Sequence, residues 1–143
     1  MRRVVITGLG LVTPLGVGAK INWDRITAGN SGIGSIESFD VSDLPSKIAG
    51  QVPKGENIEG RFNADDYMSP REQRRVDEFI IYSMGAAIQA VEDSGWKPER
   101  DIEQERTGVM IGSGIGGLQT IYEGSTLINE KGPRKVGPFF IPS

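Results

Sequence analysis

The pattern of apolar and polar positions first marks two short runs without polar alternation. Residues 3–7 and 107–111 are mostly β-branched or apolar, and a glycine follows each of them at once. Such runs are typical of strands that are buried on both faces. A weaker run over residues 47–52 lies in a stretch rich in glycine and proline and predicts a short third strand.

Two other segments carry the spacing of helices. Residues 21–28 repeat apolar side chains at helical intervals, and Gly29 follows in the position of a C-terminal cap. Residues 118–130 predict a helix near the end of the chain. With the long helix described next, the order strand–helix–helix–strand–helix predicts an α/β fold with a parallel sheet.

The start of the long helix has the sharpest local signal. Ser69, Pro70 and Glu72 form a capping box with proline at the first helical position. We expect this helix to run through Asp77, with room for a bend, and to end before Gly95. Its second half is apolar on most sides, which is typical of a helix buried inside a layered structure.

Two apolar features lack a partner in the sequence. Two or three strands are too few to build a sheet that would bury the long helix on both sides. The run Phe139–Ile141, set between two prolines, is followed only by Pro142 and Ser143. Both features predict partner strands that lie outside these residues.

Composition and charge narrow the possible functions. The net charge of -3, from 16 basic and 19 acidic residues, excludes a broad nucleic-acid footprint. The 143 residues contain no cysteine and no histidine. Thiolate metal sites, a cysteine nucleophile and a serine–histidine pair are therefore excluded within them, and we expect no metal.

The N-terminus allows two interpretations. Met1–Arg3 followed by an apolar stretch to Ala19 has the outline of a secretory signal peptide. Glycines and Pro14 interrupt that stretch, and a strand followed by a glycine turn explains the pattern better. No apolar run approaches the roughly 20 residues that span a membrane. We therefore expect a cytoplasmic protein that neither spans nor binds a membrane.

Gly112–Gly117 fits the pattern G-x-G-x-x-G between a predicted strand and a predicted helix. Backbone amides in such a turn can approach the phosphates of a dinucleotide. The ribose-binding acid of that fingerprint should end a second strand, whereas Glu130 is followed by a loop. A dinucleotide-binding domain therefore stays an alternative, and a turn needed for close packing is the simpler interpretation.

Arg71, Arg74 and Arg75 follow the spacing i, i+3, i+4, which predicts one common helix face. One interpretation is a solvated face, with Arg74 paired to Glu78. The other is a docking surface for an acidic partner, where charge raises the association rate and sets orientation. The residues alone leave both open.

Four stretches of this chain resemble the N-terminal part of the type II 3-oxoacyl-[acyl-carrier-protein] synthases, condensing enzymes of the thiolase superfamily. They are MRRVVITGLGLVTPLG at 1–16, REQRRVD at 71–77, GSGIGGL at 112–118 and GPRKVGPFFIPS at 132–143. The resemblance implies a thiolase-like layered α/β fold of two similar halves that works as a homodimer. Residues 1–143 would be most of the first half and would end before the family's nucleophilic cysteine.

The reaction that the resemblance implies is fatty-acid elongation by decarboxylative Claisen condensation. An acyl group moves from acyl carrier protein to the enzyme's cysteine, and malonyl-carrier protein then supplies two carbons. This acyltransferase needs no cofactor. No catalytic residue of the family falls within these residues, so we expect them to be inactive alone. A rival of the same fold is a non-catalytic partner subunit like the chain-length factors.

The resemblance also implies binding positions. Ile115 and Leu118 would border the acyl pocket, and Phe140 and Ile141 would reach across the dimer into the partner's pocket. Basic residues would receive the acidic carrier protein; they are Arg71, Arg74, Arg75, Arg134, Lys135 and, more weakly, Lys47. Isoleucine at position 115 resembles the type II enzymes, because the type I enzymes of the family have glycine at the matching position.

Overall fold

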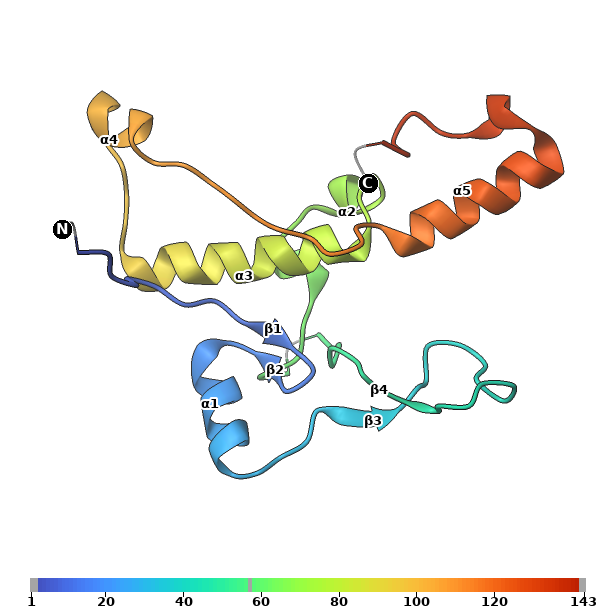
Figure 1. Cartoon of the computed structure of the whole chain (residues 1–143). Helices are drawn as coiled ribbons and strands as arrows, with labels where there is room; N and C mark the ends of the chain where they lie inside the picture. The colour runs from blue at the N-terminus through green and yellow to red at the C-terminus, as the bar shows by residue number, and fades with distance from the viewer. Residues whose placement is uncertain (1–2, 57, 142–143) are drawn as a thin grey trace. The chain divides into compact units, whose positions relative to one another are not determined.

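The computed structural model describes residues 3–56 and 58–141. They fall into two compact units, whose elements are labelled in Figure 1. The first unit contains the residues up to Asn63 together with Gly85–Gly95. The second contains Ala64–Met84 together with the residues from Trp96 onward.

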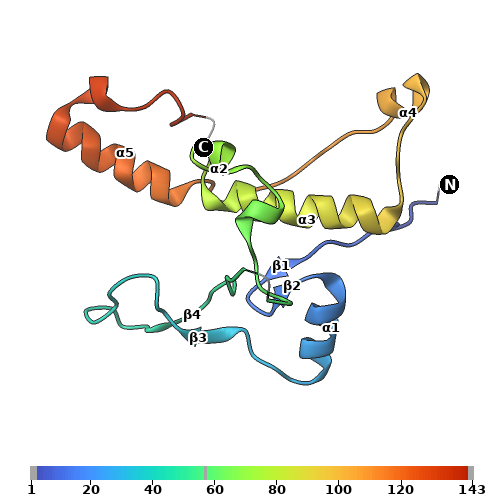
Figure 2. The ribbon, with the colours of Figure 1, turned by 180° about the vertical axis from the view of Figure 1, so that it is seen from behind.

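The first unit begins with a tight hairpin and a short helix. Strand β1 (Val12–Thr13) pairs antiparallel with β2 (Gly16–Val17), and helix α1 (Ala19–Thr27) follows beside them in both views (Figure 1, Figure 2). Gly29 lies just past α1 with a φ of 74°, which confirms it as the C-terminal glycine.

A buried polar side chain ties the hairpin to α1. Asn22 is 1% exposed and donates to the carbonyls of Gly16 and Gly18 at 3.0 and 2.8 Å. The Thr13 hydroxyl donates to its side-chain oxygen. Both polar atoms of the side-chain amide are hydrogen-bonded. Burying this group therefore costs much less free energy than burying a polar group without partners.

A second antiparallel pair completes the first unit. Strand β3 (Ile33–Ser35) pairs with β4 (Ile48–Gly50), in the register Ile33 opposite Gly50 and Ser35 opposite Ile48. The predicted strand over residues 47–52 is confirmed for residues 48–50. The expected parallel sheet is not seen, since both sheets within the described residues are antiparallel and two-stranded.

The second half of helix α3 (Glu78–Ser94) lies against the segment before the hairpin. Leu9 and Leu11 donate their amides to side-chain oxygens of Asp93 and Gln89, at 2.9 and 3.4 Å. At Gly10 an added Cβ would collide with the carbonyl oxygen of Ala86. Glycine at this position therefore permits the direct approach of two backbones.

The second unit is built from helices. It holds the 3₁₀ turns η1 (Ala64–Asp66) and η2 (Pro133–Lys135), and the helices α2 (Pro70–Gln73), α4 (Asp101–Glu105) and α5 (Leu118–Lys131). The start of α3 also belongs to it. The predicted helix over residues 118–130 is confirmed as α5.

The capping box is confirmed, but the single long helix is wrong. The Ser69 hydroxyl accepts from the Glu72 amide and donates to the Glu72 carboxylate. Helix α2 nevertheless ends at Gln73, and α3 starts only at Glu78. Four residues between them form a turn, and Asp77 caps the second helix.

Two predicted strands are absent from the structure. Residues 3–7 and 107–111 are extended coil, with Val4 94% and Met110 99% exposed. A strand needs a neighbour to pair its amides and carbonyls, and no described segment pairs with either run. The same shortage leaves α3 less buried than expected: Ile81 is buried, whereas Met84 and Val91 are exposed.

None of the helices in the described part of the chain is long and apolar enough to cross a membrane.

Candidate functional site

The glycine-rich turn runs from Gly112 to Gly117 and leads directly into α5. The Gly116 amide donates to the Ser113 hydroxyl at 3.1 Å, and Gly116 has a φ of 80°. This left-handed conformation is one that glycine adopts at little cost. Ile115 stands just before it and is 75% exposed, so the turn presents one bulky apolar side chain.

Asp77 holds the start of α5. One of its carboxylate oxygens accepts from the Thr120 amide at 3.1 Å, and the other accepts from the Glu78 amide at 2.7 Å. Partial burial acts to raise the pKa of this carboxyl. The hydrogen bonds from Thr120 and Glu78 stabilise the charged carboxylate and together outweigh the effect of burial, so the pKa lies below its usual value.

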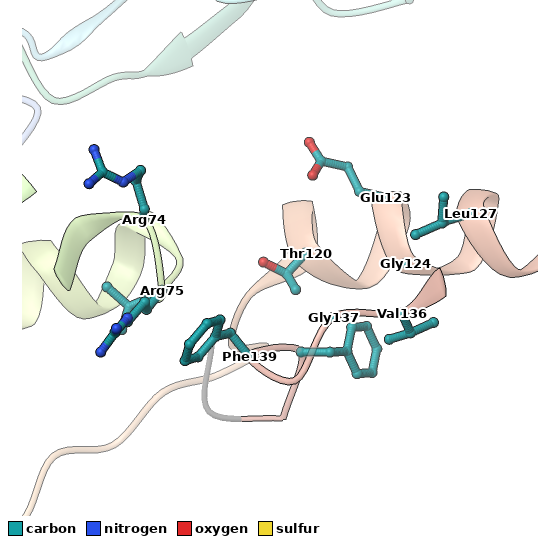
Figure 3. Close-up of a pocket in the computed structure, with 11 residues that line it drawn as sticks. Arg74, Arg75, Thr120, Glu123, Gly124, Leu127, Val136, Gly137 and Phe139 are labelled. Carbon is teal, nitrogen blue, oxygen red and sulfur yellow. The ribbon is translucent and has the colours of Figure 1, made fainter. Parts of the chain in front are cut away.

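A hollow of about 400 Å³ lies beside the start of α5, in the second unit (Figure 3). Its walls come from the turn after α2, from α5 and from the segment after η2. The lining residues are Arg74, Arg75, Val76, Thr120, Glu123, Gly124, Leu127, Val136, Gly137, Phe139 and Phe140. The hollow thus combines an apolar wall with two arginines.

Arg75 is engaged inside this hollow. Its guanidinium carbon lies 5.0 Å from the centroid of the Phe139 ring, a cation–π distance. In Figure 3 the Arg75 side chain lies beside the Phe139 ring, whereas the charged ends of Arg74 and Glu123 point away from that ring. Arg75 therefore has a packing role in addition to its charge.

Phe140 packs on the middle of α5. A Cβ added to Gly124 would lie 2.5 Å from a ring carbon of Phe140, so only glycine admits the ring at this depth. Glycine inside a helix costs about 0.5–1 kcal/mol relative to alanine. The close contact with Phe140 gives a reason for that cost.

The structure does not gather the four expected acyl-pocket residues into one cavity. Phe140 lines the hollow, whereas Ile115, Leu118 and Ile141 do not and are exposed. Their assignment to an acyl pocket stays a prediction.

The basic residues lie on several elements. Arg71 is on α2, Arg74 caps its C-terminal end, and Arg75 is in the following turn. The expected common helix face is therefore wrong, because the helix ends at Gln73. Arg71 and Arg74 are exposed, and Arg75 is half-buried.

The second basic pair belongs to the same unit as the arginines. Arg134 and Lys135 are exposed on η2, and the residues that follow them line the hollow shared with Arg74 and Arg75. Lys47 is exposed beside β4 in the first unit. Docking by these residues stays a prediction.

Sequence reasoning missed Asp77 as a site residue. Its signal was present, because aspartate directly before a helix is a preferred N-cap. What no pattern could reveal is that its carboxylate also bonds to α5, more than 40 residues away in the chain. In the described part of the chain, no cluster of acidic side chains could hold a metal ion.

Comparison with known proteins places these features in a family. The family "Beta-ketoacyl synthase, N-terminal domain" matches residues 1–143. The 3-oxoacyl-[acyl-carrier-protein] synthase 2 of Rhizobium meliloti is 54% identical over 142 residues, 99% of this chain and 34% of that protein. Its namesake in Vibrio cholerae is 46% identical over 142 residues, 99% of this chain and 32% of that protein. The chain thus spans about a third of the length of these relatives.

Solved structures agree on the fold. The ishigamide ketosynthase/chain length factor has a TM-score of 0.74 at 23% identity, over 98% of this chain and 33% of that one. A beta-ketoacyl synthase from Burkholderia phymatum has a TM-score of 0.71 at 24% identity, with the same coverage. These similarities confirm the thiolase-like α/β class. The chain belongs to the β-ketoacyl synthase family and matches its N-terminal domain.

Proposed function

We propose that this chain is the N-terminal part of a type II 3-oxoacyl-[acyl-carrier-protein] synthase, an acyltransferase that elongates fatty acids. The enzyme condenses an acyl group with malonyl-acyl-carrier protein and releases carbon dioxide. The observation that carries the proposal is the 54% identity to a protein named for this activity, sustained over 99% of the chain. The nucleophile and its supporting histidines would come from outside these residues.

Within the synthase, we assign the chain the recognition of substrate and carrier. Acyl carrier protein would be received by Arg71, Arg74, Arg134 and Lys135, which are exposed in one unit. Exposed charges act mainly by steering encounter and setting orientation, so their effect should weaken as salt rises. Arg75 would contribute less directly, since its guanidinium already lies over Phe139.

The acyl chain would enter beside the glycine turn, where Ile115 is the bulky side chain. Phe140 and Ile141 would complete the pocket of a second subunit, which makes the working enzyme a homodimer. Exposure of Ile141, at 87%, and of Phe139 supports a further contact at this segment. A cytoplasmic location is part of the same proposal, although relatives include proteins named for the mitochondrion and the chloroplast.

The alternative is a non-catalytic partner subunit of the same fold. A solved ketosynthase/chain length factor has this fold, but its 23% identity supports the fold alone. The relatives at 54% and 46% identity are both named as synthases, and this favours the catalytic assignment. Cysteine at the nucleophile position of a longer chain would decide for the synthase.

A charge reversal tests the docking assignment. In the protein at the length of its relatives, Arg71→Glu with Arg74→Glu should lower kcat/KM for acyl-carrier protein and leave small acyl thioesters nearly unaffected. Arg106→Glu is the matched control, because Arg106 is also exposed but lies at the end of α4. Equal loss with both kinds of substrate, or an equal loss in the control, would refute the docking surface.

A further inference from the structure

Helix α5 begins at a residue that has no side chain to cap it. Its N-cap is Gly117, and no side chain of that residue can bond to the free amides of the first turn. The first amides of a helix lack partners within the helix, and serine, threonine, aspartate or asparagine usually supplies one from the N-cap. In α5 the partner comes from the turn that precedes α3.

Asp77 takes the place of the missing cap. Thr120 is the third residue of α5, the position whose amide an N-cap carboxylate would bond, and its amide donates to Asp77 at 3.1 Å. The second carboxylate oxygen accepts from Glu78 at the start of α3. One carboxylate thus serves the positive ends of two helices, where negative charge is favoured.

The same arrangement explains the glycine at 117. A Cβ there would lie 2.7 Å from an Asp77 carboxylate oxygen and 3.0 Å from its Cβ. Gly112 and Gly114 in the same turn have open space around the corresponding position. Among these three glycines, only Gly117 is required by close packing, because the Asp77 carboxylate occupies the space that a Cβ at residue 117 would need.

We infer that Asp77 is a positioning residue that fixes the glycine turn, and with it Ile115, by capping α5 from the turn before α3. Ile115 lies two residues before Gly117, so the held end of the turn sets where its side chain stands. The consequence for substrate rests on the proposed function: Asp77 would control acyl-chain length without touching the acyl group.

A double-mutant cycle tests the cap itself. Asp77→Ala removes the acceptor, and Gly117→Ser places a side chain where the carboxylate now lies. Each single change should lower Tm and speed amide exchange at Thr120. The double variant should recover much of the loss, because the introduced hydroxyl can then cap α5 from its usual position. Gly114→Ser, in open space, is the control that should not couple to Asp77→Ala.

Losses that simply add in the double variant would overturn the inference, as would unchanged exchange at Thr120 in Asp77→Ala. Activity gives the second readout. In the protein at the length of its relatives, Asp77→Ala should slow the longest acyl primers on the order of tenfold more than short ones, a difference of about 1.4 kcal/mol in barrier. Asp77→Asn, which keeps one acceptor oxygen, should restore part of the preference. Equal slowing of primers of all lengths would show that Asp77 stabilises the fold without controlling acyl-chain length.

The two proposals can fail separately. Coupling in the cycle with no primer-length effect of either Asp77→Ala or Ile115→Phe would leave the cap intact and refute the acyl pocket. A primer-length effect of Ile115→Phe without coupling in the cycle would keep the pocket and refute the cap.

Discussion

At the scale of single residues, the chain separates side chains that pack from side chains that remain available. Arg75 and Phe140 are held by specific contacts, with the Phe139 ring and with Gly124. Arg71, Arg74 and Ile115 are exposed. Because the second group is exposed, a substitution there should change recognition with little effect on folding.

Ile115→Phe provides the first residue-scale test. Added volume at a packed site typically costs about 1–3 kcal/mol. Because Ile115 is 75% exposed in this chain, that cost should fall on a bound long acyl group and leave Tm little changed. In the protein at the length of its relatives, initial rates with primers of increasing length should show a shorter maximum length for Ile115→Phe.

Ile121→Phe is the control for this test, since Ile121 is an exposed isoleucine on α5 outside the proposed pocket. Slowing of long and short primers by the same factor in Ile115→Phe would contradict the pocket assignment.

The carboxyl of Asp77 predicts a pH dependence. Its pKa is lowered in the folded chain, so the folded state favours the charged form. The stabilising contribution is therefore present above the ordinary aspartate pKa, about 3.9, and is lost as pH falls through the lowered folded value. The difference in unfolding free energy between the parent and Asp77→Asn, measured by urea titration, should shrink across this acidic range. A difference that grows as pH falls would contradict the assignment.

At the scale of elements, the sequence predicted those whose signals are local. The Ser69 capping box, the C-terminal Gly29 and helix α5 depend on neighbouring residues, and all are present. The runs at 3–7 and 107–111 were predicted as strands but need neighbours to pair with, and the described residues supply none. Local chemistry is therefore readable from sequence, whereas pairing depends on the surrounding structure.

The candidate site follows the same division. The glycine turn, the arginines and the aromatic run were recognisable as motifs. That Asp77 caps α5 was not, because a contact across more than 40 residues leaves no periodic signal. The break after Gln73 also escaped prediction, since Arg74, Arg75 and Val76 are all compatible with a continuing helix.

The contact between residues 8–11 and α3 gives an element-scale prediction. Gly10→Ala should destabilise the first unit by about 1–3 kcal/mol, because the new methyl group meets the rigid carbonyl of Ala86. Urea unfolding would measure the loss. Gly34→Ala, on β3 with open space around it, is the matched control and should cost far less. Equal losses would show that the close approach is unimportant.

At the scale of the whole molecule, the chain exposes more apolar side chain than a folded domain normally leaves to water. Val4, Ile6, Val109 and Met110 are each more than 80% exposed. Large exposed apolar segments usually mark surfaces that another segment or subunit covers.

This exposure predicts a difference between chain lengths. In the protein at the length of its relatives, amides of residues 4–6 and 109–111 should exchange slowly with solvent, whereas the 143 residues alone should exchange them rapidly. Hydrogen exchange read by mass spectrometry would report both segments. Rapid exchange at both lengths would show that these runs stay unpaired.

Under the proposed function, the chain belongs to a catalytic condensing enzyme and contributes recognition, while its nucleophile lies outside these residues. Intact-mass measurement after incubation with acyl-carrier protein tests this most directly. We expect an acyl adduct on the protein at the length of its relatives, and its conversion to 3-oxoacyl-carrier protein when malonyl-carrier protein is added. We expect no adduct on residues 1–143 alone. An adduct on the 143 residues, or a folded longer protein that forms neither adduct nor product, would contradict it.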